Sequence, residues 1–152
     1  MSGNQTGADQ AAAPAKKIDK ETAGNEFIRY CDSNRIEHNE DEMNEEELES
    51  FNDIKNRFIK ACTEGRVEVD GRNIKYTLSE FSPEGFRAEV VTIKRPGGNA
   101  FSAGDSFKEK ESIKKLQGFM SAQTGKDVSY FTKVDIVDWK FFNAIASLFL
   151  SL

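Results

Sequence analysis

The chain has 152 residues, of which 38% are hydrophobic and 31% are charged, and this length allows one domain with a modest core. Its net charge of −5 and its isoelectric point near 5.1 argue against a general nucleic-acid binder, which would carry a basic stripe. No N-terminal stretch joins a positively charged start to an apolar core of signal-peptide length, so we do not expect export.

Two cysteines, Cys31 and Cys62, lie inside or beside predicted helices. We interpret them as a reduced cytosolic pair that fills apolar positions in the core. A disulfide or a redox role stays open as the alternative, although neither residue has a CxxC partner or metal-ligand neighbours.

The N-terminal part divides into a tail and an acidic helical segment. Residues 1–20 are mostly small and polar, which predicts a disordered tail. Residues 21–64 form the acidic helical segment, which opens with a short predicted helix bearing Phe27, Ile28, Cys31 and Ile36.

An acidic run at 37–49 holds eight acids in thirteen residues. Asn44 followed by Glu47 matches a capping box, and acids are favoured at the positive end of a helix. We therefore favour a solvated helix terminus, with a dedicated site for a basic partner as the alternative. The helix that follows has one apolar stripe, and Gly65 can end it in a left-handed conformation. That stripe comprises Leu48, Phe51, Ile54, Phe58, Ile59 and Cys62.

Residues 65–152 are predicted to form an α+β core domain. At 66–94 the apolar residues alternate with polar ones, Asp70-Gly71 gives a hairpin cue and "SPEG" at 82–85 gives a second turn. We predict a small three-stranded antiparallel β-meander flanked by helices.

The α-helical C-terminal half follows a loop at 95–105, whose glycines lack the spacing of a phosphate-binding loop. A helix is predicted over 106–123, with a lysine-rich face that we interpret as solvated rather than as a ligand site. A short helical turn then precedes a helix over 135–151, with Asp135 as its N-cap and Asp138 in its first turn.

No catalytic or metal-binding constellation emerges from the sequence. His38 is the only histidine, and it has no recognisable nucleophile and orienting partner around it. One histidine, two scattered cysteines and plentiful carboxylates do not make a ligand set. We expect a non-enzymatic protein without catalytic residues, cofactor or metal.

Three stretches of the C-terminal half carry a family resemblance: "YTL" at 76–78, "VVTIKRPGG" at 90–98 and "LQGFMSAQTGKDVSYFTKVDIVDWKFFNAIASLFL" at 116–150. Together they resemble the tail assembly chaperones of long-tailed bacteriophages. The sharpest marks are Thr124-Gly125 and the aspartate that precedes the last helix. The resemblance covers residues 65–152, whereas the first 64 residues depart from the compact members of the family.

The resemblance implies a function in the cytoplasm of an infected host cell. Such chaperones are thought to coat the helical tape-measure protein before the tail tube polymerises around it. In many phages a ribosomal frameshift appends a second domain that recruits tail-tube subunits. The implied partners are therefore the tape-measure protein and tail-tube subunits, with homo-oligomerisation as a further expectation and with neither nucleic acid nor membrane.

The final helix itself favours a binding role. It is apolar nearly all round, and such a helix is either central to a core or an exposed docking element. It is too short for a membrane span of about 20 residues and contains Lys140 and Asn143. We interpret one side as core and expect the remaining apolar surface to mark a partner site. The candidate partner-binding residues are Trp139, Phe141, Phe142, Ile145, Phe149 and Leu152.

Two other functions stay open. A small structural tail or baseplate subunit could use the terminal helix to pack in an oligomer. A non-enzymatic adaptor could use the acidic run at 37–49 to capture a basic partner, and salt would weaken that interaction.

Overall fold

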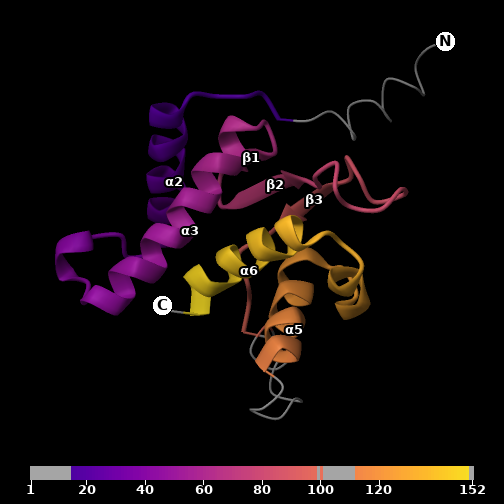
Figure 1. Cartoon of the computed structure of the whole chain (residues 1–152). Helices are drawn as coiled ribbons and strands as arrows, with labels where there is room; N and C mark the ends of the chain where they lie inside the picture. The colour runs from indigo at the N-terminus through magenta and orange to yellow at the C-terminus, as the bar shows by residue number, and fades with distance from the viewer. Residues whose placement is uncertain (1–14, 99, 101–111, 151–152) are drawn as a thin grey trace.

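A computed structural model describes residues 15–98, 100 and 112–150 of the chain (Figure 1). It confirms the predicted α+β class: a three-stranded antiparallel sheet lies between helices. The elements run in the order α2 (Lys20–Asn34), η1 (Glu40–Glu42), α3 (Glu45–Thr63), β1 (Val67–Asp70), β2 (Asn73–Thr77), β3 (Val90–Ile93), α5 (Ser112–Thr124), η3 (Val128–Thr132) and α6 (Ile136–Leu150).

The two N-terminal helices pack against each other, and both are capped as their sequences require. Asp19 caps α2 by accepting a hydrogen bond of 2.7 Å from the Thr22 amide. Asn44 and Glu47 form the predicted reciprocal capping box at the start of α3. Between the helices, Phe27 of α2 contacts the rings of Phe51 and Phe58 of α3. The acidic run is thus divided between η1 and the first turns of α3.

Gly65 ends α3 as predicted, with a φ of 75°. A Cβ atom at this position would lie 2.8 Å from the carbonyl oxygen of Ala15, because the chain at 15–18 runs against it. Ile18 in this stretch packs on the core. Residues 15–19 are therefore part of the packed body, although the sequence places them in a tail; the rest of the predicted tail lies outside the described residues.

The sheet is the predicted meander, in the order β1-β2-β3. Asp70 pairs with Asn73, so Gly71 and Arg72 alone make the first turn, and Gly71 has a φ of 63°. Tyr76 pairs with Val67 on one side and with Val91 on the other. The third strand covers only Val90–Ile93, because residues 78–89 form a turn-rich connection.

Helix α6 lies in the middle of the molecule, between α3 and α5 (Figure 1). Phe142 contacts the rings of Tyr76 and Phe131 edge to face, and Phe149 contacts Tyr30 in the same way. The helix therefore joins the N-terminal helices, the sheet and η3 into one core. The predicted loop at 95–105 and helix start at 106–111 lie mostly outside the described residues.

Candidate functional site

A buried carboxylate fastens the start of α6 to the chain that leaves β2. Asp138 is completely buried, and it accepts hydrogen bonds from the Ser79 amide at 3.0 Å, the Ser79 hydroxyl at 2.8 Å and the Ser82 hydroxyl at 2.6 Å. The Ser82 oxygen in turn accepts a bond of 2.9 Å from the Asp135 amide. The turn at 79–82 is thus tied at both ends to the first turn of α6.

Two further groups from the sheet side complete this network. The Tyr76 hydroxyl donates to Asp138 at 2.7 Å, and burial raises the pKa of this phenol well above its ordinary value, so it stays protonated. The Arg66 guanidinium lies 3.8 Å from the Asp138 carboxylate and is also bonded to Tyr76 and Glu64. Donors and a cation therefore surround the buried Asp138 side chain, so its oxygens are not left without partners.

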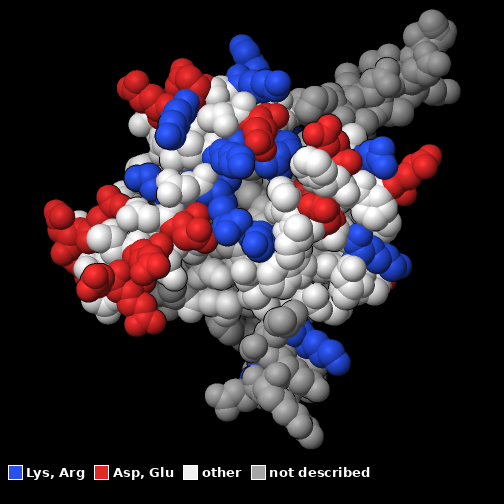
Figure 2. All heavy atoms as spheres, in the orientation of Figure 1, with Lys and Arg blue, Asp and Glu red and all other residues white. Residues whose placement is uncertain are grey.

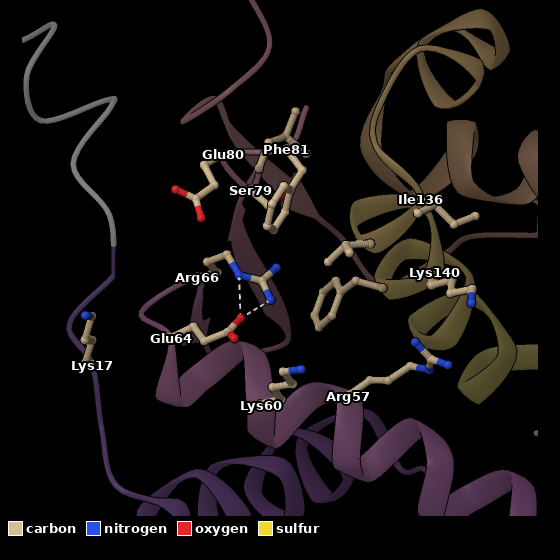
Figure 3. Close-up of a pocket in the computed structure, with 13 residues that line it drawn as sticks. Lys17, Arg57, Lys60, Glu64, Arg66, Ser79, Glu80, Phe81, Ile136 and Lys140 are labelled. Carbon is tan, nitrogen blue, oxygen red and sulfur yellow. Dashed lines mark hydrogen bonds and ion pairs between the residues drawn. The ribbon is translucent and has the colours of Figure 1, made fainter. Parts of the chain in front are cut away.

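The network brings together apolar side chains that are not buried. Phe81 lies in the turn at 79–82, and Ile136 and Val137 begin α6; their exposed fractions are 66%, 60% and 40%. All three line a cleft of about 670 Å³ between this turn, the start of α6 and the end of α3 (Figure 3). Only one other large hydrophobic residue in the described chain, Leu150, is exposed.

Cations dominate the polar lining of this cleft. Five basic residues and two acidic residues line it: Lys17, Arg57, Lys60, Arg66 and Lys140, with Glu64 and Glu80. Arg66 is paired with Glu64, and Arg57 forms an exposed ion pair of 3.0 Å with Asp53. The three lysines form no ion pair with any residue that the structure describes. The cleft thus combines an apolar rim with unneutralised positive charge.

Most of the side chains predicted to bind a partner lie in the protein's own core. Phe141, Phe142, Ile145 and Phe149 are at most 3% exposed. Phe141 reaches the floor of the cleft, and its ring stacks on Tyr76 with centroids 4.2 Å apart. Trp139 is half-buried in a neighbouring hollow, and Leu152 lies outside the described residues. The expected apolar surface of α6 is therefore confined, in the described chain, to its ends.

Phe81, Ile136 and Val137 are not among the residues that the sequence predicts to bind a partner. The signals were present: Phe81 is an aromatic residue beside a turn sequence, and the other two directly follow an N-cap. The helical spacing of the apolar residues favoured the middle of α6 as the partner-binding surface. In the structure the sheet and α5 cover that part of the helix. The burial of Asp138 could not be read from its favourable position in a first turn.

The two cysteines and His38 do not line the cleft. Both cysteines are buried and free, and burial raises the pKa of each thiol to about 12. His38 contacts Asp32 at 2.6 Å on the surface. Within residues 15–98, 100 and 112–150 there is no cluster of three or more metal-ligating side chains.

Comparison with known proteins gives no assignment: no family model, curated protein or solved structure shows a significant match to the chain. None of the helices that the structure describes is long and apolar enough to cross a membrane.

Proposed function

We propose that this protein is a tail assembly chaperone of a long-tailed phage, which binds the tape-measure protein in the host cytoplasm. One observation carries the proposal: three of the four exposed large hydrophobic residues in the described chain gather on one cationic cleft. Exposed apolar groups with a polar surround mark protein-binding sites. The resemblance over residues 65–152 supplies the identity of the client.

The cleft has the chemistry of a reversible docking site. Burying each of its apolar side chains on a client contributes about 1.5–3 kcal/mol before ordering costs. The neighbouring cations orient the client and speed its association with the cleft, and they contribute less to the affinity itself. A chaperone must leave its client during assembly. A small apolar contact surrounded by charged side chains favours such release.

Co-expression with the tape-measure protein tests this function. The Phe81→Ser/Ile136→Ser variant should lose the client in affinity purification while its thermal unfolding midpoint stays within a few degrees of the wild type. Leu150→Ser is the control, since Leu150 is also apolar and exposed but lies outside the cleft. Absence of the client from the wild-type purification, or its full retention by the double variant, would contradict the proposal.

The content of finished particles separates this function from that of a structural tail subunit. A chaperone leaves during assembly, so mass spectrometry of purified phage should not detect the protein. Its presence in particles at a fixed ratio to the tail-tube subunit would favour a structural subunit instead.

A further inference from the structure

The cationic cleft is one end of a longer trough along the boundary between α3 and α6. The cleft shares Arg57 and Lys140 with a second hollow of about 890 Å³. That hollow shares Ile54 and Ser147 with a third, of about 630 Å³. The three hollows therefore adjoin one another along the contact between α3 and α6, and together we call them the trough.

The charge of the trough reverses from one end to the other. At the cleft end stand the cations described above, and at the far end the lining holds four carboxylates and one cation, Arg35; the carboxylates are Glu37, Glu42, Glu46 and Glu47. Figure 2 shows the basic residues gathered over the centre of this face and the acidic residues over its left side. Along α3, Glu46 and Arg57 are about 17 Å apart at 1.5 Å per residue.

Apolar side chains are present at both ends of the trough, and charges of both signs lie in its middle. Phe81, Ile136 and Val137 line the cationic end. Met43 and Ile54 are partly buried at the acidic end. Between them the trough is lined by small and amide side chains of both helices, by Glu49 and by the Arg57–Asp53 ion pair, with Trp139 half-buried among them.

We propose that this trough binds one amphipathic α-helix in a single orientation. The occupant carries carboxylates in the half that lies at the cleft and lysines or arginines in the half that lies against the glutamates. Apolar residues on its inner face contact the two apolar ends. Helix-in-groove recognition of this kind uses anchors about one or two turns apart. The inference rests on the proposed function, because it names the chemistry of the client segment.

The direction of the bound helix follows from charge. Carboxylates are stabilised near the N-terminus of a helix and basic residues near its C-terminus. A helix with this usual bias therefore places its N-terminus at the cationic cleft. It runs parallel to α6, which begins at the cleft with Ile136, and antiparallel to α3.

Trp139 provides a direct reporter, because it is the only tryptophan of the chain and lines the middle of the trough. The probes are two designed helical peptides of about 20 residues with the same composition and apolar face. One has glutamates in its N-terminal half and lysines in its C-terminal half, and the other has these charges exchanged. The acid-first peptide should change Trp139 fluorescence and bind roughly tenfold more tightly than the other at low salt.

Charge reversal in the trough tests the site of binding. Lys60→Glu/Lys140→Glu should abolish the preference for the acid-first peptide or reverse it. Lys114→Glu/Lys133→Glu makes the same change of net charge at exposed positions outside the trough, so it should keep the preference. Loss of the preference in both variants would overturn the proposal.

Further results would also test whether the trough binds a helix in one orientation. Equal binding of the two peptides, or binding of neither, would overturn the oriented-helix proposal. A dimer in sedimentation that dissociates on Lys60→Glu/Lys140→Glu would identify a second copy as the occupant and would overturn it as well. If the tape-measure protein still co-purifies in any of these cases, the proposed function stands and only the inference about the trough fails.

Discussion

Tyr76, on the central strand, and Asp138, in the first turn of α6, are joined by a hydrogen bond of 2.7 Å although 62 residues separate them. The bond fixes the start of α6 against the sheet, and the serines at 79 and 82 fix the adjoining turn to the same carboxylate. The position of the exposed apolar residues beside the cationic cleft depends on this buried junction. The junction at Asp138 therefore links the stability of the fold to the geometry of the cleft.

Asp138→Asn should lower the free energy of unfolding by about 2–4 kcal/mol, because an amide nitrogen replaces one of the accepting oxygens and then faces the donors of Tyr76, Ser79 or Ser82. Urea unfolding measures this change. Asp127→Asn is the matched control, since Asp127 is exposed and its side chain forms no capping hydrogen bond. A change below 1 kcal/mol for Asp138→Asn would show that the junction contributes little.

Tyr76→Phe should lower the free energy of unfolding by about 1–3 kcal/mol, since it removes one donor to a buried carboxylate. The ring that stacks on Phe141 is kept, so the loss reports the hydroxyl group. Tyr130→Phe removes a hydroxyl that bonds to the half-buried Glu89 and should cost less. Equal losses in urea unfolding for the two variants would contradict a special role for the buried junction.

Asn44→Ala should destabilise the protein by about 1 kcal/mol, because it removes one half of the capping box that starts α3. Asn39→Ala removes the cap of η1, a helix of three residues, and should have a smaller effect. Unfolding midpoints in urea compare the two. A larger loss for Asn39→Ala would contradict the assignment of Asn44 as the main cap of the acidic run.

Local signals in the sequence predicted the elements well. The capping box at Asn44, the left-handed Gly65 and the turn at Gly71 are short-range features, and the structure confirms all three. The site depends instead on long-range contacts. The turn at 79–82 meets α6 only because the sheet and the helix pack together, and no local pattern reports that meeting.

For the last helix, α6, the sequence likewise predicts the element but not its long-range contacts. Its sequence predicts a helix with an apolar circumference, and the structure bears this out. Which side is exposed depends on which elements pack against it. Because β2 and η3 cover Phe142 and α2 covers Phe149, the exposed apolar side chains at the start of the helix are Ile136 and Val137.

Both cysteines should resist a thiol reagent at pH 8 in the native protein and react fully in urea. Burial raises the pKa of Cys31 and Cys62 to about 12, so the reactive thiolate is scarce and covered. A colorimetric disulfide-exchange assay counts the accessible thiols. Rapid reaction of either cysteine without denaturant would contradict its place in the core.

The same burial predicts that stability falls at alkaline pH. The thiols ionise near pH 9 when unfolded and near pH 12 when folded, so the stabilisation is complete below pH 9 and is lost as the pH rises towards 12. The buried Tyr30 and Tyr76, whose pKa values burial also raises, act in the same direction. Urea midpoints at pH 8, 9 and 10 should decrease in that order, and an increase would contradict this account.

Site-specific photo-crosslinking tests the central claim most directly. A photoreactive phenylalanine analogue replaces Phe81 in the chain that is co-expressed with the tape-measure protein, and a second sample carries it at Leu150. Binding in the cleft predicts a covalent adduct with the client from position 81 and little or none from position 150. An adduct from position 150 alone, or none from either position while the two proteins still co-purify, would contradict binding at the cleft.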